Sequence, residues 1–314
     1  MNGYLNVEDL SLTWHTLPLC LIISQIKANI NSIYQQNHQV NMATTLQRFL
    51  RKNPIFTYDI FAQAISGDHA RSKNTIKALL AHHIQQGHII RVRRRLFAAV
   101  PVGADPKTYP INPYLVAGYA TSDAVLAYHS ALSFYQMAYS ASYRFTYLTQ
   151  YQSSHFSFRS ESYEGVRFPA SLVQQHQESI FIHTEDVQGL NVRVTSLERT
   201  LVDVLDKPKL GGGWEEIWRS LDMIDRIKIN QVAEYALLLN NATTVAKVGF
   251  YLSQRQKELN VPADVLLELQ KACPRSPHYI DHTARKNGKL LDDWNIIVPK
   301  TLIIKSSATR GYRQ

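Results

Sequence analysis

The segment from Met42 to Pro101 constrains the fold of this chain most. Three helical patterns follow one another there, at residues 45–50, 59–65 and 72–86. The last one stops at Gly87 and leads directly into Ile89–Ala98, where two β-prone stretches flank an arginine-rich tip. Helix-turn-helix units place their last helix in the DNA major groove, and a charged hairpin beside it can hold flanking phosphates. The pattern therefore predicts a winged helix-turn-helix over residues 42–101.

The positive charge of the chain concentrates in the same segment. Residues 42–105 contain ten basic and three acidic side chains, which gives +7 of the formal +9 of the whole chain. A local positive field attracts polyanions, because bound Lys and Arg release counterions from a phosphate backbone. The alternative is a solvated basic surface that only keeps the protein soluble. The positive charge falls on the predicted helix and hairpin, and this coincidence favours nucleic-acid binding.

The third predicted helix has two distinct faces. Ser72 is expected to cap its N-terminus by accepting a bond from a free amide of the first turn. An apolar stripe at helical spacing should face the core, and it comprises Ile76, Leu79, Leu80 and Ile84. Lys73, Asn74 and Lys77 lie opposite this stripe. Asn can pair with adenine, whereas Lys touches either phosphate or guanine.

The predicted hairpin alternates apolar and cationic residues, since Ile90 and Val92 interleave with Arg91 and Arg93. Tight two-residue hairpins prefer Gly or Asn at the tip, so an arginine tip predicts a longer or mildly strained turn. Phosphate contacts are expected from the tip, and minor-groove insertion stays open. The candidate DNA contacts are Arg71, Ser72, Lys73, Asn74, Lys77, Arg91, Arg93, Arg94 and Arg95.

The length of 314 residues requires at least one further domain. Cys20 and Cys273 provide no disulfide framework, which favours a reducing cytoplasm. The longest apolar run, Leu17–Ile23, is too short to cross a bilayer, and no secretory signal or membrane partner is expected.

Residues 1–41 form an N-terminal extension with two open interpretations. Leu19–Tyr34 carries an apolar stripe at helical spacing, which would need the body of this protein or a second copy as a partner surface. Alternatively, Met42 is the working start and the extension is not native.

After a linker, residues 106–314 are expected to form a second domain. Residues 106–212 alternate helix and strand patterns, and residues 213–314 are mainly helical in pattern. A helix is predicted over 117–137 and another after Ser196, its expected N-cap. Strands are predicted at 145–148, 156–158, 180–183 and 192–194. The predicted class is α+β: an N-terminal winged helix-turn-helix followed by a mixed α/β domain with a helical C-terminal part.

Three motifs in this second part resemble one known family. They are Val194-Thr-Ser-Leu-Glu-Arg-Thr-Leu-Val-Asp203, Ser130-Ala-Leu-Ser-Phe-Tyr135 and Val245-Ala-Lys-Val-Gly-Phe-Tyr-Leu252. With the N-terminal segment, they make residues 42–255 similar to AbiEi-type antitoxins. A departure is Arg95, where relatives tend to have a glycine in the wing.

The resemblance implies a bacterial type IV antitoxin encoded beside a nucleotidyltransferase-like toxin. Such a protein represses its own operon at inverted repeats and neutralises the toxin without a stable complex. The implied partners are double-stranded operator DNA and, indirectly, the cognate toxin. A monomer that binds DNA cooperatively is the expectation for the oligomeric state, which the sequence leaves open. The alternative is a ligand-responsive winged-helix regulator without a toxin partner; a nuclease targeted by the winged helix is a third hypothesis.

No catalytic residue, cofactor or metal is expected. Paired carboxylates beside a Gly-Ser turn, and a Gly-rich loop followed by Lys-Ser or Lys-Thr, do not occur. His278 and His282 lie four residues apart near Cys273, but no glutamate follows the first histidine, as a zinc protease requires. Arg199 and Asp203 are spaced for an ion pair on one helix, for which a structural role is expected. The basic C-terminal residues are either a frayed tail or a second polyanion surface.

Overall fold

The computed structural model describes residues 45–66, 72–152, 154–281, 288–300 and 302. The N-terminal extension, Arg71 and His282 lie outside these residues. The described residues form a mixed α/β structure, which agrees with the α+β expectation. Among them, no helix has the length and apolarity that a bilayer span requires.

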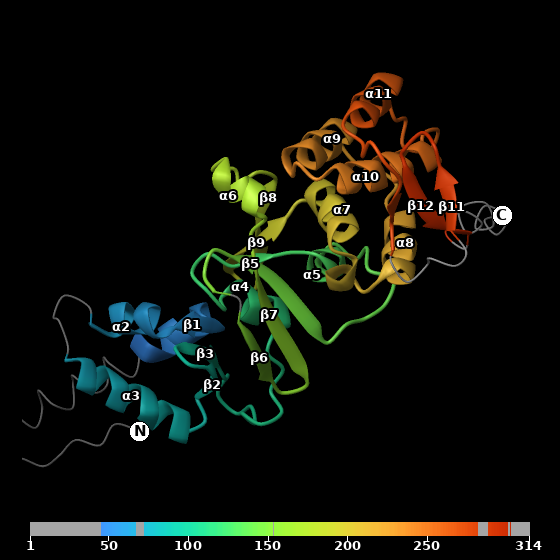
Figure 1. The fold of residues 1–314 in the computed structure, drawn as a ribbon. Helices are drawn as coiled ribbons and strands as arrows, with labels where there is room; N and C mark the ends of the chain where they lie inside the picture. Colours follow the sequence, from blue (N-terminus) through green and yellow to red (C-terminus); the bar gives the residue numbers. More distant parts are fainter. Residues whose placement is uncertain (1–44, 67–71, 153, 282–287, 301, 303–314) are drawn as a thin grey trace, which may run out of the picture.

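The N-terminal module, residues 45–100, combines short helices with a three-stranded sheet (Figure 1). Residues 45–52 are helical and are followed by β1 (Ile55–Thr57), α2 (Tyr58–Ser66), α3 (Lys73–Gln85), β2 (Ile89–Arg93) and β3 (Leu96–Ala99). The sheet is antiparallel with strand order β1-β3-β2. Phe49, Phe56, Phe61 and Phe97 form its aromatic core, with neighbouring ring centroids 5.1–5.9 Å apart. These rings bury large apolar surfaces, and Leu46, Ile76 and Leu80 complete the core around them.

The centre of the molecule is a six-stranded mixed sheet of order β6-β7-β5-β4-β9-β8. Its strands are β4 (Val125–Leu126), β5 (Arg144–Thr149), β6 (His155–Phe158), β7 (Glu161–Arg167), β8 (Ile182–Val187) and β9 (Leu190–Thr195). β4 and β9, and β5 and β7, are parallel; the other neighbours are antiparallel. Three short helices lie between the strands: α4 (Pro113–Gly118), α5 (His129–Phe134) and α6 (Ala170–Gln174).

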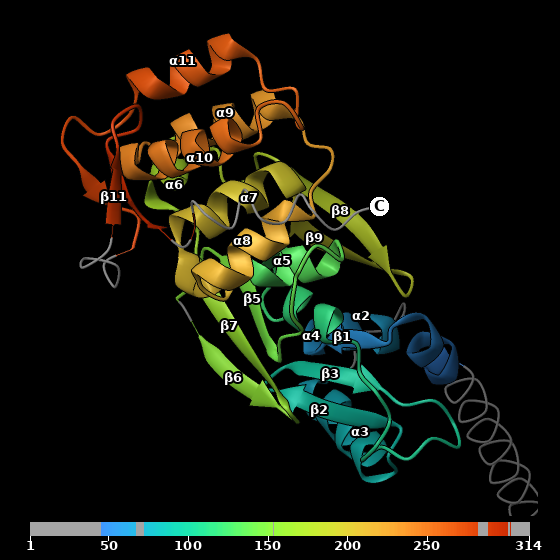
Figure 2. The ribbon, with the colours of Figure 1, turned by 90° about the vertical axis from the view of Figure 1, so that its right-hand side faces the viewer.

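Helices lie in layers on one side of this sheet (Figure 2). They are α7 (Leu197–Asp206), the 3-10 helix η2 (Pro208–Gly211), α8 (Trp214–Asp222), α9 (Ile229–Leu238), α10 (Ala242–Gln254) and α11 (Ala263–Lys271). Of these, α9, α10 and α11 form the outer layer in Figure 2. Side chains of a strand alternate between faces, and β4 follows that rule. Val125 packs with the helices, whereas Leu126 packs toward α4 and the N-terminal module.

The N-terminal module and the central sheet share one apolar cluster. Val92, Leu96 and Ala98 of the module are buried together with Leu115 of α4 and Val192 of β9. The two parts are therefore joined by packed side chains as well as by the connecting chain. This packing holds the N-terminal module in one orientation against the central sheet.

Several elements differ from the sequence-based expectation. The predicted helix over 117–137 is interrupted, because Val125–Leu126 pairs with both β5 and β9 in the buried centre of the sheet. Strands β1 and β7 and helices α4 and α6 were not predicted, and β8 lies at Ile182–Val187 where a strand was predicted at 180–183. The mainly helical C-terminal part ends in a small sheet formed by β10 (His278–Tyr279), β11 (Gly288–Leu291) and β12 (Ile296–Pro299). Residues 288–300 are thus not a frayed tail.

Trp294 anchors this small sheet on α10. A Cβ built on Gly249 would lie 1.9 Å from Cζ3 of Trp294, so the indole ring occupies the space that any larger side chain needs. Gly249→Ala is therefore expected to destabilise the fold by about 1–3 kcal/mol, the usual cost of overpacking. Urea unfolding measures this loss, and Gly249→Ala combined with Trp294→Leu should recover part of it. A stabilising Gly249→Ala would contradict the packing described here.

Candidate nucleic-acid interface

Helix α3 has the two faces that the sequence predicts. Ser72 Oγ accepts a hydrogen bond from the backbone N–H of Thr75 at 3.1 Å and caps the helix. Ile76 and Leu80 are buried in the module core, and Leu79 and Ile84 pack against it. Lys73, Asn74 and Lys77 are all exposed. The apolar stripe thus fixes the helix while two cations and an amide remain accessible to a ligand.

The β2–β3 hairpin turns through two residues, Arg94 and Arg95. Arg95 has φ +66°, in the left-handed region that glycine adopts more readily. The register shifts between Arg91 and Arg93, which marks a bulge beside the turn. Of the two expectations for the tip, the tight and mildly strained turn is the one observed.

Contacts to α2 compensate for the conformation of Arg95. Its guanidinium Nη2 donates to the carboxylate of Asp59 at 2.6 Å, and it lies 5.4 Å from the ring centroid of Tyr58. The backbone N–H of Tyr58 donates to the Arg95 carbonyl at 3.0 Å. A glycine could adopt the same turn but would lose the side-chain contacts. The exposed ion pair itself contributes about 0–1 kcal/mol.

Arg93 is also engaged within the protein. Its guanidinium lies 4.6 Å from the ring centroid of Phe156 on β6, and the residue is half-buried. Arg91 and Arg94 are exposed. Arg91 also lies 5.9 Å from the ring centroid of Phe97, at the edge of cation–π range, so three of the four hairpin arginines lie near an aromatic ring, and Arg94 is the most freely exposed of the described hairpin arginines. Neither Phe156 nor Asp59 was predicted to contact the hairpin, because both are distant in sequence.

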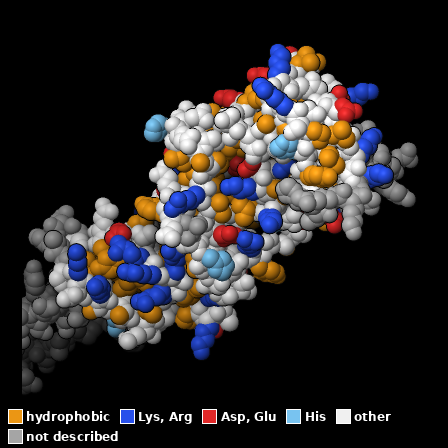
Figure 3. Space-filling view, in the orientation of Figure 1, with side chains coloured by type: hydrophobic (Ala, Val, Ile, Leu, Met, Phe, Trp, Pro, Cys, Tyr) orange, Lys and Arg blue, Asp and Glu red, His pale blue; other side chains and the backbone are white. Residues whose placement is uncertain are grey.

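The surface of the N-terminal module is strongly cationic. Figure 3 shows Lys and Arg side chains gathered over this end of the molecule. Among the described residues of the module, Asp59 is the only acidic side chain, and Arg95 neutralises it. The remaining formal charges on this described surface are positive, which suits a polyanionic partner. Arg71, the other candidate contact, lies outside the described residues.

Arg199 and Asp203 form a buried pair between α7 and the central sheet. Arg199 Nε lies 3.5 Å from Asp203 Oδ2, and Arg199 Nη1 donates to the carbonyls of Glu178 and Ile180 at 2.8 and 2.7 Å. Tyr235 donates to Asp203 at 2.7 Å. Burial raises the pKa of Asp203 to about 6, although Arg199 and Tyr235 act in the opposite direction. The contacts agree with the expected structural role.

The histidine pair near the C-terminus is described only in part. Thr243 Oγ1 and His278 Nδ1 lie 2.9 Å apart, and His282 lies outside the described residues. Within the described ranges, no three His, Cys, Asp or Glu side chains cluster as metal ligands.

Comparison with known proteins identifies a similar fold. No protein-family model matches the chain, and no curated protein is significantly similar to it in sequence. The crystal structure of the RV2827C protein from Mycobacterium tuberculosis is similar, with a TM-score of 0.55 and 14% sequence identity. The match covers 86% of this chain and 95% of that chain. The likeness therefore concerns the arrangement of secondary structure over most of both chains.

Proposed function

We propose that residues 45–100 form a winged helix-turn-helix that binds double-stranded DNA. In this proposal α3 enters the major groove, and the β2–β3 hairpin is the wing that contacts the phosphate backbone. The observation that carries the proposal is the exposed face of α3, where Lys73, Asn74 and Lys77 stand opposite a buried apolar stripe. Exposed Arg91 and Arg94 on the adjoining hairpin extend the same positive surface.

The chain as a whole is proposed to be a cytoplasmic, AbiEi-type antitoxin that represses its own operon. Its motifs at 130–135, 194–203 and 245–252 support the family assignment. Residues 106–314 would then supply neutralisation of a nucleotidyltransferase-like toxin, and no catalytic role is assigned to any residue. A ligand-responsive regulator is the second candidate, favoured by a cavity beside α3. A nucleotidyltransferase gene next to this one would support the antitoxin over the regulator.

Titration of the upstream intergenic DNA at several salt concentrations tests the proposed binding. Arg94 is exposed at the tip of the hairpin, so Arg94→Gln should remove about one phosphate contact. The slope of log affinity against log salt should therefore become shallower by about one unit. Lys271→Gln, the same charge change at an exposed position on α11, should leave the slope unchanged. An unchanged slope for Arg91 and Arg94 replaced together would exclude the hairpin as a DNA contact.

A further inference from the structure

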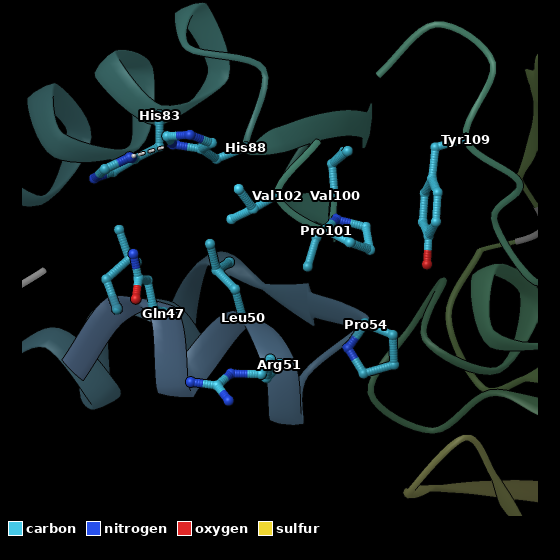
Figure 4. A pocket seen from close by; sticks show the side chains of 12 residues that line it. Gln47, Leu50, Arg51, Pro54, His83, His88, Val100, Pro101, Val102 and Tyr109 are labelled. Carbon is cyan, nitrogen blue, oxygen red and sulfur yellow. Dashed lines mark hydrogen bonds between the residues drawn. The ribbon is translucent and has the colours of Figure 1, made fainter. Parts of the chain in front are cut away.

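An open cavity lies at the edge of the N-terminal module, between helical residues 45–52, the C-terminal end of α3, and the chain that leaves β3 (Figure 4). Its volume is about 530 Å³. The wall is mainly apolar and includes Leu46, Leu50, Pro54, Val100 and Val102. Cavities of about 300–1,000 Å³ with apolar walls and a few polar groups are typical of small-molecule sites.

The polar groups of the wall are basic or neutral. His83 Nδ1 and His88 Nδ1 lie 3.4 Å apart, so one ring donates to the other. Burial lowers the pKa of His83 to about 4, with His82 and His88 adding to the effect, and this keeps the ring neutral at pH 7. Arg51 carries the formal charge of the described wall, in which no side chain is acidic.

We infer that this cavity binds a small apolar molecule carrying a carboxylate, with its apolar part against Leu50 and Val102 and its carboxylate toward Arg51. The guanidinium offers donors in the fork geometry that a carboxylate accepts. A second protein is a poor fit for the space, because a stable protein interface buries about 800 Å² on each partner. A small anion with an apolar body matches the volume of the cavity, its apolar wall and the positive charge of Arg51.

The position of the cavity connects it with DNA binding, if the proposed function holds. His83 belongs to the last turn of α3, and Val100 follows β3 directly. A molecule bound there touches both the helix proposed to enter the groove and the start of the linker. If ligand binding changes operator affinity, the operator must change ligand affinity by the same factor.

Calorimetry with full-length protein tests the inference, using 1-naphthoate and its neutral analogue 1-naphthalenemethanol as probes. We expect one equivalent of naphthoate to bind and to shift the ring NMR signals of His83 and His88. Arg51→Gln should weaken naphthoate binding by roughly tenfold, the size expected for a hydrogen bond to a charged group, with little effect on the alcohol.

Val102 is 84% exposed. Val102→Trp can therefore obstruct the cavity without loss of core packing and should weaken both probes by about tenfold.

Leu267→Trp, at an exposed apolar position on α11, is the matched control and should leave both affinities unchanged. Three results would overturn the inference. The first is the absence of saturable naphthoate binding, as expected if another part of the chain fills the cavity. The others are equal affinity for the acid and the alcohol, and unchanged affinity for both probes in Val102→Trp. The DNA titration is run separately without either probe. A failure of naphthoate to bind would therefore leave the proposed operator binding untouched. A failure to bind operator DNA would likewise leave the naphthoate result untouched.

Discussion

Replacing Arg199 by methionine is expected to destabilise the protein by about 3–5 kcal/mol, because it leaves the buried Asp203 carboxylate without its cation. The side chain of Arg199 is fully buried, and its two bonds to the carbonyls of Glu178 and Ile180 hold α7 against the segment before β8. Methionine has a similar apolar length but no donor. The substitution therefore removes the hydrogen bonds and the charge while preserving much of the packing.

Urea unfolding of Arg199→Met measures this effect, and the chain contains a matched control. Glu215 and Arg219 form an ion pair of the same four-residue spacing on α8, with Glu215 mostly exposed. Arg219 also donates to Tyr139 Oη, but both contacts lie at the surface, so Arg219→Met should lower the unfolding midpoint far less than Arg199→Met. Arg199→Met combined with Asp203→Leu should regain part of the lost stability, because the second change removes the unpaired charge. Equal, small effects of Arg199→Met and Arg219→Met would show that the buried pair does not hold the fold.

Substituting the exposed face of α3 should abolish most operator binding. Lys73→Gln, Asn74→Ala and Lys77→Gln together remove two cations and one amide that can pair with a base. We expect affinity to fall by about a hundredfold or more at physiological salt, and the salt slope to become shallower by about two units. The helix itself should survive, because all three side chains are exposed and lie away from Ile76 and Leu80.

The control for this triple variant matches its charge. Lys257→Gln with Lys271→Gln removes two exposed cations from the C-terminal helical part. Binding to the operator and to an unrelated duplex should be compared for both variants by fluorescence anisotropy. An equal loss for both variants would indicate general electrostatic attraction, and no loss for the α3 variant would exclude this helix as the interface.

Local patterns predicted helix α3 well. The bounds of α3, the Ser72 cap and the buried stripe depend on residues within a few positions of one another, and the structure confirms them. The same holds for Ser196, whose Oγ accepts from the N–H of Arg199 at 3.2 Å. Helical periodicity and capping chemistry are local properties, so one sequence suffices to recognise them.

Contacts between distant segments could not be predicted in this way. The two residues of β4 form a strand because β5 and β9 enclose them, although their neighbours in sequence favour helix. The pairing of Arg95 with Asp59 and of Arg93 with Phe156 likewise requires the tertiary fold. Both contacts narrow the candidate interface, because they engage Arg93 and Arg95 within the protein and leave Arg94 as the most exposed candidate of the hairpin.

The apolar cluster shared by the N-terminal module and the central sheet has a practical consequence for dissecting this protein by truncation. A fragment beginning after Pro101 would lack Val92, Leu96 and Ala98, and would expose Leu115 and Val192 to water. Such a fragment is prone to aggregate, so a loss of function measured on it would report on solubility as much as on the residues removed. Point substitutions on the surface of the intact chain test the contribution of each part without exposing this cluster.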